Sequence, residues 1–451
     1  MENQNQGNHK SRAGLAARAG AFAKKVLTNP LTYVLLAAIL FRIVYFHTLR
    51  PYSETADSPT YKDLGNILTG LRTPIYPLLL AGLNALFGEP LMNMVLVRLQ
   101  SLVALCALGA FYYTVVRLTH RRYLAVVFTL LFGLQPGVVG YETSVMTESL
   151  SISGVVFLVF LLVRYLDDRR KCDAAGLGVL ALFLVLLRPA FLYLVGVLAV
   201  FWVLQWFLEA PEKKKNILWG FLGTGISVAG VLVWCAFNFF NCGRFTLSVV
   251  TDINLLHMLV LNGSVENPEY PEMSEYVWNK MVENQEDEAY LPWGAYNDIT
   301  AAYPDEWDEY ASSTLKYHVG DMLDYTVTKA AGLLNQPFLN DQPYAHLWYY
   351  KSFGSAVRNL LFDAKVVQVL RFLAVELIYS FTWWAVKKRI NWMGLGLAGC
   401  TLATMATSVV GAQAEWYRLW LPSFPFLILL GSLWAYRLCV WLGRKDEQPL
   451  A

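Results

Sequence analysis

Three parts of the chain carry side chains that could bind a phosphate group or move a proton. The first lies just after the first long apolar run and contains Asp57, Tyr61, Arg72 and Tyr76 at short intervals. A carboxylate placed beyond a membrane-length segment suits a general base at the bilayer surface. An arginine fork can bind two phosphate oxygens at once. The stretch therefore suggests a base beside an arginine that can bind an anionic phosphate.

Local alternatives exist for both charges. Asp57 can form a turn with Ser58 and Pro59, as aspartate often does before proline. Glu54 is a second carboxylate in the same loop but lacks the same surroundings. Arg72 can be a solvated or snorkelling cation between two helices.

A second acidic stretch joins two apolar segments and contains Tyr141, Glu142 and Glu148. These carboxylates can face a cavity, or they can cap the start of a helix. Glu148 is placed to sink into the membrane, where a lone carboxylate is costly. Arg188 sits inside an apolar run and needs a partner or cavity, or snorkels at a kink.

The start of the last apolar segment adds a third group, Glu415, Tyr417 and Arg418, beside Trp416 and Trp420. An aromatic belt at the membrane surface explains the tryptophans and the tyrosine. It does not explain the adjacent charges. Arg418 is therefore a second candidate for binding a phosphate.

Composition indicates a membrane protein. Of 451 residues, 56% are hydrophobic and 16% charged, and mean hydropathy is +0.39, whereas a soluble protein carries about a quarter charged residues. The net charge of +2 gives no reason to expect a nucleic-acid partner. The six cysteines form no disulfide framework, and no histidine has metal-ligand spacing, so the sequence predicts no metal site.

Apolar runs of about 20 residues, the length that crosses a bilayer, predict ten spans. They begin near residues 28, 91, 123, 147, 174, 190, 216, 360, 392 and 419. Arg188-Pro189 interrupts the region 174–208, which can be two short spans or one kinked span. Alternate connections are rich in Lys and Arg, so the positive-inside rule places them, and both termini, in the cytoplasm.

This topology divides the chain into four parts. Residues 1–27 form a cytoplasmic tail, and 28–238 form an N-terminal transmembrane module whose first outer loop, 47–90, carries Asp57. Residues 239–358 form an extracytoplasmic, acidic and mostly helical cap. Residues 359–451 return through the membrane to a cytoplasmic tail.

Three features together resemble a known family: Asp57, Tyr61 and the run Gly70-Leu-Arg72-Thr-Pro74-Ile-Tyr76-Pro77. This pattern resembles the first extracytoplasmic loop of the GT-C class of integral-membrane glycosyltransferases. More narrowly, it resembles the branch that includes protein-mannosyltransferases and the lipid A aminoarabinose transferase. The segment from Glu415 to Pro422 is similar to the C-terminal signature of this branch, although Trp416 replaces its first arginine.

The resemblance implies an all-α polytopic bundle of the GT-C type, with about ten transmembrane helices, in the cell (inner) membrane. It implies an inverting transfer of a hexosyl or pentosyl group from a polyprenyl-phosphate sugar to a glycan, lipid or protein acceptor on the outer side. Asp57 would be the base and Glu142 would line the site. The substrate-binding candidates are Tyr61, Arg72, Tyr76, Tyr141, Arg188, Glu415, Tyr417 and Arg418. No cofactor is implied beyond the lipid-linked donor.

Two other functions remain open from the sequence. An O-antigen or polysaccharide polymerase or ligase would work through its large outer loop. A transporter of lipid-linked glycans would place its essential residues near mid-membrane, in repeats or broken helices. The sugar and the acceptor are not specified by any motif.

Overall fold

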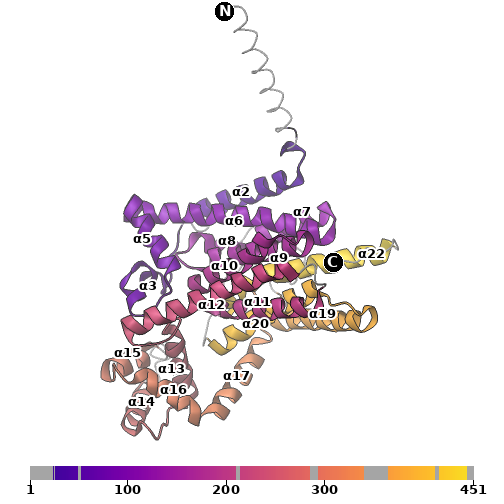
Figure 1. Cartoon of the computed structure of the whole chain (residues 1–451). Helices are drawn as coiled ribbons and strands as arrows, with labels where there is room; N and C mark the ends of the chain where they lie inside the picture. Colours follow the sequence, from indigo (N-terminus) through magenta and orange to yellow (C-terminus); the bar gives the residue numbers. More distant parts are fainter. Residues whose placement is uncertain are drawn as a thin grey trace, which may run out of the picture.

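The computed structural model describes residues 24, 26–48, 52–209, 214–284, 293–339, 364–411 and 416–443. Within these ranges the chain is helical, and β structure is limited to two isolated bridges. Long helices pack together in a bundle, and shorter helices from the middle of the chain form a cap at one end (Figure 1). The predicted all-α, polytopic architecture is confirmed.

Seven helices of the described part are long and apolar enough to cross a membrane. They are Leu91–Thr119, Glu148–Asp168, Pro189–Leu208, Lys214–Cys242, Val366–Lys387, Trp392–Gly411 and Trp416–Gly443. The bent pair Arg122–Gly133 and Pro136–Thr143 makes an eighth if it is one span. The other two predicted positions hold α2 (Pro30–Thr48) and α10 (Lys171–Leu187), the latter only 17 residues long. Every predicted span therefore coincides with a helix.

The bent pair has an identifiable cause. Helix α7 (Arg122–Gly133) ends shortly before Pro136, which starts α8 (Pro136–Val139) and the 3₁₀ turn η1 (Gly140–Thr143). Proline has no N–H to donate and cannot continue the preceding helix, so the axis turns, here by 54°. The bend delivers the segment 140–147 to the start of α9 (Glu148–Asp168).

The region 174–208 is two helices. Helix α10 ends at Leu187, and Arg188 is extended (φ −154°, ψ 114°), as expected for a residue before proline. The short turn η2 (Pro189–Phe191) then leads into α11 (Leu192–Leu208). This resolves the choice that the sequence left open.

Helices α10 and α12 (Lys214–Cys242) touch backbone to backbone. A Cβ on Gly178 would lie 2.1 Å from the carbonyl carbon of Gly223, so neither position has room for a side chain. Further along, Gly230 of α12 faces Leu182 of α10. The contacts move in the same direction along both helices, so α10 and α12 run parallel. Helix α11, which connects them in the sequence, therefore runs in the opposite direction. We call this contact the glycine seam.

The cap has its own hydrophobic core, separate from the core of the long helices. Residues such as Leu256, Val277, Ile299 and Tyr310 are its fully buried members. It is built by α13 (Val250–Asn262), α14 (Pro271–Glu283), α15 (Trp293–Ala302), α16 (Trp307–Tyr317) and α17 (Val319–Leu333).

Three of the basic connections meet at one end of the bundle. Arg117 pairs with Asp167 and Asp168, and Arg169 pairs with Glu209. The side chain of Asn216, near the start of α12, donates to the carbonyl of Arg169. Glu148 and Arg188 lie at the opposite ends of α9 and α10. These two charges are therefore separated along the bundle from the basic connections. Which end faces the cytoplasm remains the prediction made from the basic loops.

The remaining helices complete the frame around the site. They are α3 (Ser58–Lys62), α4 (Gly65–Leu68), α5 (Ile75–Phe87), α6 (Glu89–Thr119), α19 (Val366–Lys387), α20 (Trp392–Gly411), α21 (Trp416–Trp420), η6 (Leu421–Ser423) and α22 (Phe424–Gly443).

Candidate functional site

Asp57 is held between two arginines from opposite ends of the chain. Its Oδ1 accepts a hydrogen bond from Arg72 Nη2 at 2.8 Å, and its Oδ2 accepts one from Arg418 Nη2 at 2.9 Å. Arg418 is 361 residues away in the sequence. The side chains are partly buried, with 26% of Asp57, 14% of Arg72 and 16% of Arg418 exposed. Two of the three sequence regions with candidate charges therefore meet directly.

The turn around Asp57 is made by its neighbours and leaves its carboxylate available. Thr60 Oγ1 donates to the Asp57 carbonyl at 2.6 Å, and Pro59 lies in the first turn of α3. The Asp57 side chain forms no capping hydrogen bond to that helix. A turn-forming role thus does not account for the carboxylate, which points to the arginines instead.

Arg72 is fixed by the same short helix. Its Nε donates to Thr60 Oγ1 at 2.8 Å and its Nη1 to the Tyr61 hydroxyl at 3.2 Å. The guanidinium carbon lies 4.2 Å from the centre of the Tyr61 ring, a cation–π contact. Tyr61 in turn meets the buried Tyr76 edge to face. Tyr61 therefore orients the arginine directly, with Tyr76 packed against Tyr61, and a freely snorkelling cation would not have these partners.

Arg418 also reaches a second carboxylate. Its Nε lies 3.3 Å from Glu148 Oε1, and the same oxygen is 3.1 Å from Arg188 Nη1. Glu148 is 1% exposed, and its Oε2 is buried without a hydrogen-bond partner in the described part of the chain. Three arginines and two carboxylates thus form one chain of contacts with one positive charge in excess. We call these five residues, Arg72, Asp57, Arg418, Glu148 and Arg188, the outer cluster, after the side of the membrane that the basic loops predict for them.

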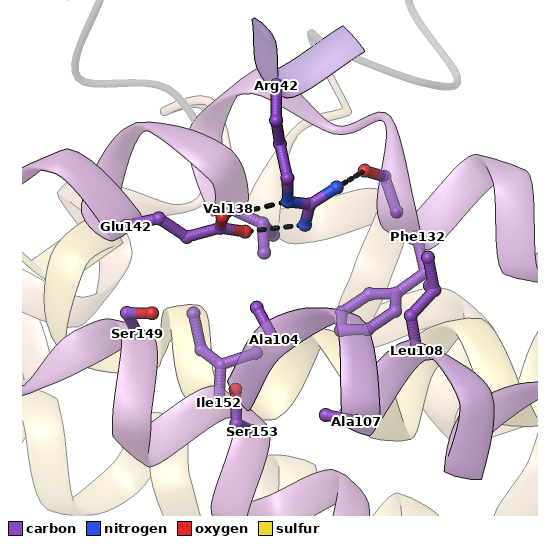
Figure 2. A pocket seen from close by; sticks show the side chains of 11 residues that line it. Arg42, Ala104, Ala107, Leu108, Phe132, Val138, Glu142, Ser149, Ile152 and Ser153 are labelled. Carbon is purple, nitrogen blue, oxygen red and sulfur yellow. Dashed lines mark hydrogen bonds and ion pairs between the residues drawn. The ribbon is translucent and has the colours of Figure 1, made fainter. Parts of the chain in front are cut away.

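Glu142 lies elsewhere, contrary to the expectation that it faces Asp57. It is 1% exposed and makes a two-point ion pair with Arg42 of α2, shown in Figure 2. The turn η1 directs it toward α2, whereas Glu148, at the start of α9, faces the arginines. The predicted cost of burying Glu148 is offset by these two cationic partners. The prediction from the sequence therefore named the wrong one of two nearby carboxylates as the neighbour of Asp57.

The other predicted residues are less closely tied to the cluster. Tyr141 and Tyr417 are half-buried and pack against the main core. Glu415 lies outside the described residues. Arg42 was missed, although it carries the signal that singled out Arg188, an arginine inside an apolar run.

Lys329 of α17 was also missed. It lies over the rings of Tyr325 and Trp416, the latter two residues before Arg418. Burial lowers the pKa of Lys329 to about 8. The cap thus places a cation against the short helix that carries Arg418, and its sequence position within the acidic segment gave no sign of this.

The electrostatics of Asp57 limit what it can do at rest. Burial raises its pKa, but the charges of Arg418 and Arg72 and their hydrogen bonds outweigh this effect and hold the pKa below its usual value. Asp57 is therefore ionised at neutral pH and is a weak proton acceptor while both arginines hold it.

In the part of the chain that the structure describes, no three His, Cys, Asp or Glu side chains gather to hold a metal ion. Between Asp57 and Glu148 lies the guanidinium of Arg418. The groups available for binding a ligand are thus cations, which suit an anion.

No family model matches the chain, and no curated protein matches it. Among solved structures, the apo oligosaccharyltransferase of Archaeoglobus fulgidus is similar with 15% identity and a TM-score of 0.48, over 93% of this chain and 53% of that one. Archaeal oligosaccharyltransferase AglB from Archaeoglobus fulgidus, in complex with an inhibitory peptide and a dolichol-phosphate, gives 12% identity and a TM-score of 0.43, over 93% and 52%. The chain spans about half the length of these proteins. The described helices themselves, seven of them long and apolar enough to cross a membrane, make the chain an all-helical, multi-pass membrane protein.

Proposed function

We propose that the protein is a membrane glycosyltransferase of the GT-C type. It would transfer a sugar from a polyprenyl-phosphate donor to a hydroxyl or amine of a glycan, lipid or protein on the outer side of the membrane. The observation that carries the proposal is the carboxylate of Asp57 clasped by Arg72 and Arg418, in a cluster with an excess of positive charge. A base and a phosphate-binding pair then lie within contact distance of one another.

The donor's phosphate competes with Asp57 for the two arginines. Arginine binds phosphate oxygens in pairs through its planar fork. The donor's phosphate is a diester with one negative charge, and the cluster has one positive charge to spare for it. Arg188, held through Glu148, adds a third cation beside them. Binding of the phosphate therefore draws the forks away from Asp57.

This exchange turns Asp57 into a better base. The arginines lower its pKa, so when they turn to the phosphate, the pKa rises toward the range useful for proton transfer. Asp57 then takes the proton of the acceptor, whose oxygen or nitrogen attacks the anomeric carbon. The bond from that carbon to the phosphate oxygen breaks on the opposite face, and its electrons stay on the phosphate, so the configuration inverts. The arginines offset the charge that grows on the departing phosphate.

The basic loops favour a cytoplasmic position for the end of the bundle that carries Arg117 and Arg169. Asp57 then faces the outer side, where polyprenyl-phosphate sugars present their headgroups. Cysteine labelling should reach residues beside Asp57 from outside only, and residues beside Arg169 from inside only. Labelling of both from the same side would contradict this orientation.

The test of the activity is transfer by the purified protein in lipid nanodiscs, with a polyprenyl-phosphate sugar as donor. Glycan analysis of a deletion strain would first name the sugar and acceptor, because one sugar should be missing. If the protein were a transporter, its deletion would instead leave the lipid-linked substrate on the inner leaflet. A polymerase or ligase would shorten or detach whole chains. Either result would contradict the proposed function.

A further inference from the structure

We propose that Arg42 and Glu142 are positioning residues that fix both carboxylates of the outer cluster through the segment 143–148. The inference rests on the proposed function for its kinetic test, but one of its tests below is independent of activity. Neither residue touches the cluster, so they act through the backbone between them.

All three guanidinium nitrogens of Arg42 are engaged, two by Glu142 and one by main-chain carbonyls. Arg42 Nε lies 2.8 Å from Glu142 Oε2, and Arg42 Nη2 lies 2.5 Å from Oε1. The remaining nitrogen, Nη1, donates to the carbonyls of Gly133 and Ala38 at 3.3 and 3.2 Å. Gly133 ends α7, where the break before Pro136 leaves a carbonyl without a helical partner. One buried arginine therefore joins α2, the end of α7 and the turn η1 (Figure 2).

The next residues are bonded to the loop that carries Asp57. Ser53 N donates to the carbonyl of Thr143 at 3.0 Å, and Val145 N donates to the carbonyl of Ser53 at 3.2 Å. The hydroxyls of Ser53 and Ser144 lie 2.7 Å apart. Two main-chain bonds and one side-chain bond thus hold the two loops in register.

A second connection reaches the neighbour of Asp57. Ser58 is fully buried, and its hydroxyl donates to the carbonyl of Val145 at 3.0 Å. Gln100 donates to the carbonyls of Glu142 and Ser144 from the other side. Glu148 begins α9 three residues after Val145. Moving this segment would shift Asp57 and Glu148 together.

The space beside the pair argues against a direct catalytic role. The cavity next to Arg42 and Glu142 has a volume of about 10 Å³, which holds on the order of one water molecule. Figure 2 shows apolar side chains, with Ser149 and Ser153, on its other walls. A sugar cannot enter, and both oxygens of Glu142 are already engaged by Arg42.

The test removes the pair without leaving a lone buried charge. Replacing both partners of a buried ion pair with apolar residues is often neutral for stability, so Arg42→Met/Glu142→Leu should insert and fold. The expected result is a kcat about 10- to 100-fold lower, as for small misplacements of catalytic groups, with the KM for donor changed less than about 3-fold. The matched control is Arg437→Met/Glu376→Leu, which removes a similarly buried pair between α22 and α19 and should keep normal turnover. Equal turnover in both double variants would overturn the proposal.

Hydrogen exchange gives the readout that does not depend on turnover. The amides of Ser53 and Val145 are protected by the bridge between the loops. Their exchange should accelerate in Arg42→Met/Glu142→Leu and stay slow in the control. If exchange accelerates but no donor is used by any form of the protein, the proposed function fails while the positioning role stands. Unchanged exchange in the Arg42/Glu142 variant would refute the positioning role, whatever the activity.

Discussion

Two clusters in this molecule combine arginine with carboxylate inside the helical bundle, and they are built differently. Glu376 of α19 is fully buried, and both of its oxygens are satisfied. Oε1 accepts from Ser380 and Asn391, and Oε2 accepts from Trp434 and Arg437, all within 2.6–2.8 Å. One carboxylate faces one arginine, so the cluster is neutral and closed.

The outer cluster differs in charge, in exposure and in hydrogen bonding. It holds more arginines than carboxylates, Asp57 is 26% exposed, and Glu148 Oε2 has no hydrogen-bond partner among the described residues. A buried charge alone therefore does not identify a functional site in a membrane protein. The imbalance of charge and the spare hydrogen-bonding capacity distinguish the cluster that we propose as a ligand site from the one that joins helices.

The largest effect should come from removing the base. Asp57→Asn preserves size and can still contact the arginines but cannot take a proton, so we expect transfer to fall by about 10²-fold or more. Glu54→Gln is the control, because Glu54 is a more exposed loop carboxylate paired with Lys62, and it should be far milder. The measurement is single-turnover transfer in nanodiscs. Near-normal turnover in Asp57→Asn would mean that the outer cluster, like the Glu376 cluster, is structural.

A smaller loss is expected when either clasping arginine becomes lysine. An ammonium keeps the charge but cannot make a planar two-point contact. Losing one charge-assisted hydrogen bond, about 1.5–3 kcal/mol, should weaken donor use about 10- to 100-fold. Titration of Arg72→Lys and Arg418→Lys with donor should show this loss, with acceptor affinity nearly unchanged. Unchanged donor dependence in both would place the phosphate elsewhere, with Arg188 the next residue to test.

Breaking the closed cluster should affect stability and spare turnover. Glu376→Gln leaves Arg437 without its buried counter-charge, and removing one partner of such a pair costs about 3–5 kcal/mol. Thermal unfolding in detergent should shift downward, while turnover per folded molecule stays the same. A loss of turnover without a loss of stability would erase the contrast between the clusters.

The smallest effect concerns a surface contact in the cap. His318 Nδ1 lies 2.8 Å from Asp321, and its Nε2 lies 2.8 Å from the carbonyl of Glu266. The hydrogen bond to Asp321 raises the pKa of His318 above its usual value. The protonated form is thus favoured in the folded state. Its contribution to stability is fully present below about pH 6.5 and is lost as pH rises through the raised pKa. Thermal unfolding of the protein should show this slope, and His318→Gln should flatten it.

The sequence predicted most of the residues that meet in the outer cluster, but not how they meet. Asp57, Arg72, Arg418 and Arg188 were all named, because short-range patterns and charges in apolar runs are visible in one dimension. Their assembly was less predictable, since Asp57 and Arg418 meet across 361 residues.

Glu142 and Glu148 show where the pattern fails. Both follow the same bend, and which one faces Asp57 depends on how η1 turns and where α9 begins. Hydrophobic periodicity does not encode that rotation. The span positions were predictable from apolar length, but the separation of α10 from α11 depended on Arg188 and Pro189, where the residue types allowed a kink or a turn.

The glycine seam has a consequence for how the protein sits in membranes of different thickness. Gly178 lies nine residues before Leu187, the last residue of α10, which is about 14 Å of rise, and Arg188 follows directly. Because the backbones of α10 and α12 touch at this contact, we expect the two helices to keep a fixed position along one another. The height of Arg188 is then set by the partner helix and not by the surrounding lipid. Thinner or thicker bilayers would change which side chains face hydrocarbon, yet the distance from the seam to this cation would stay the same.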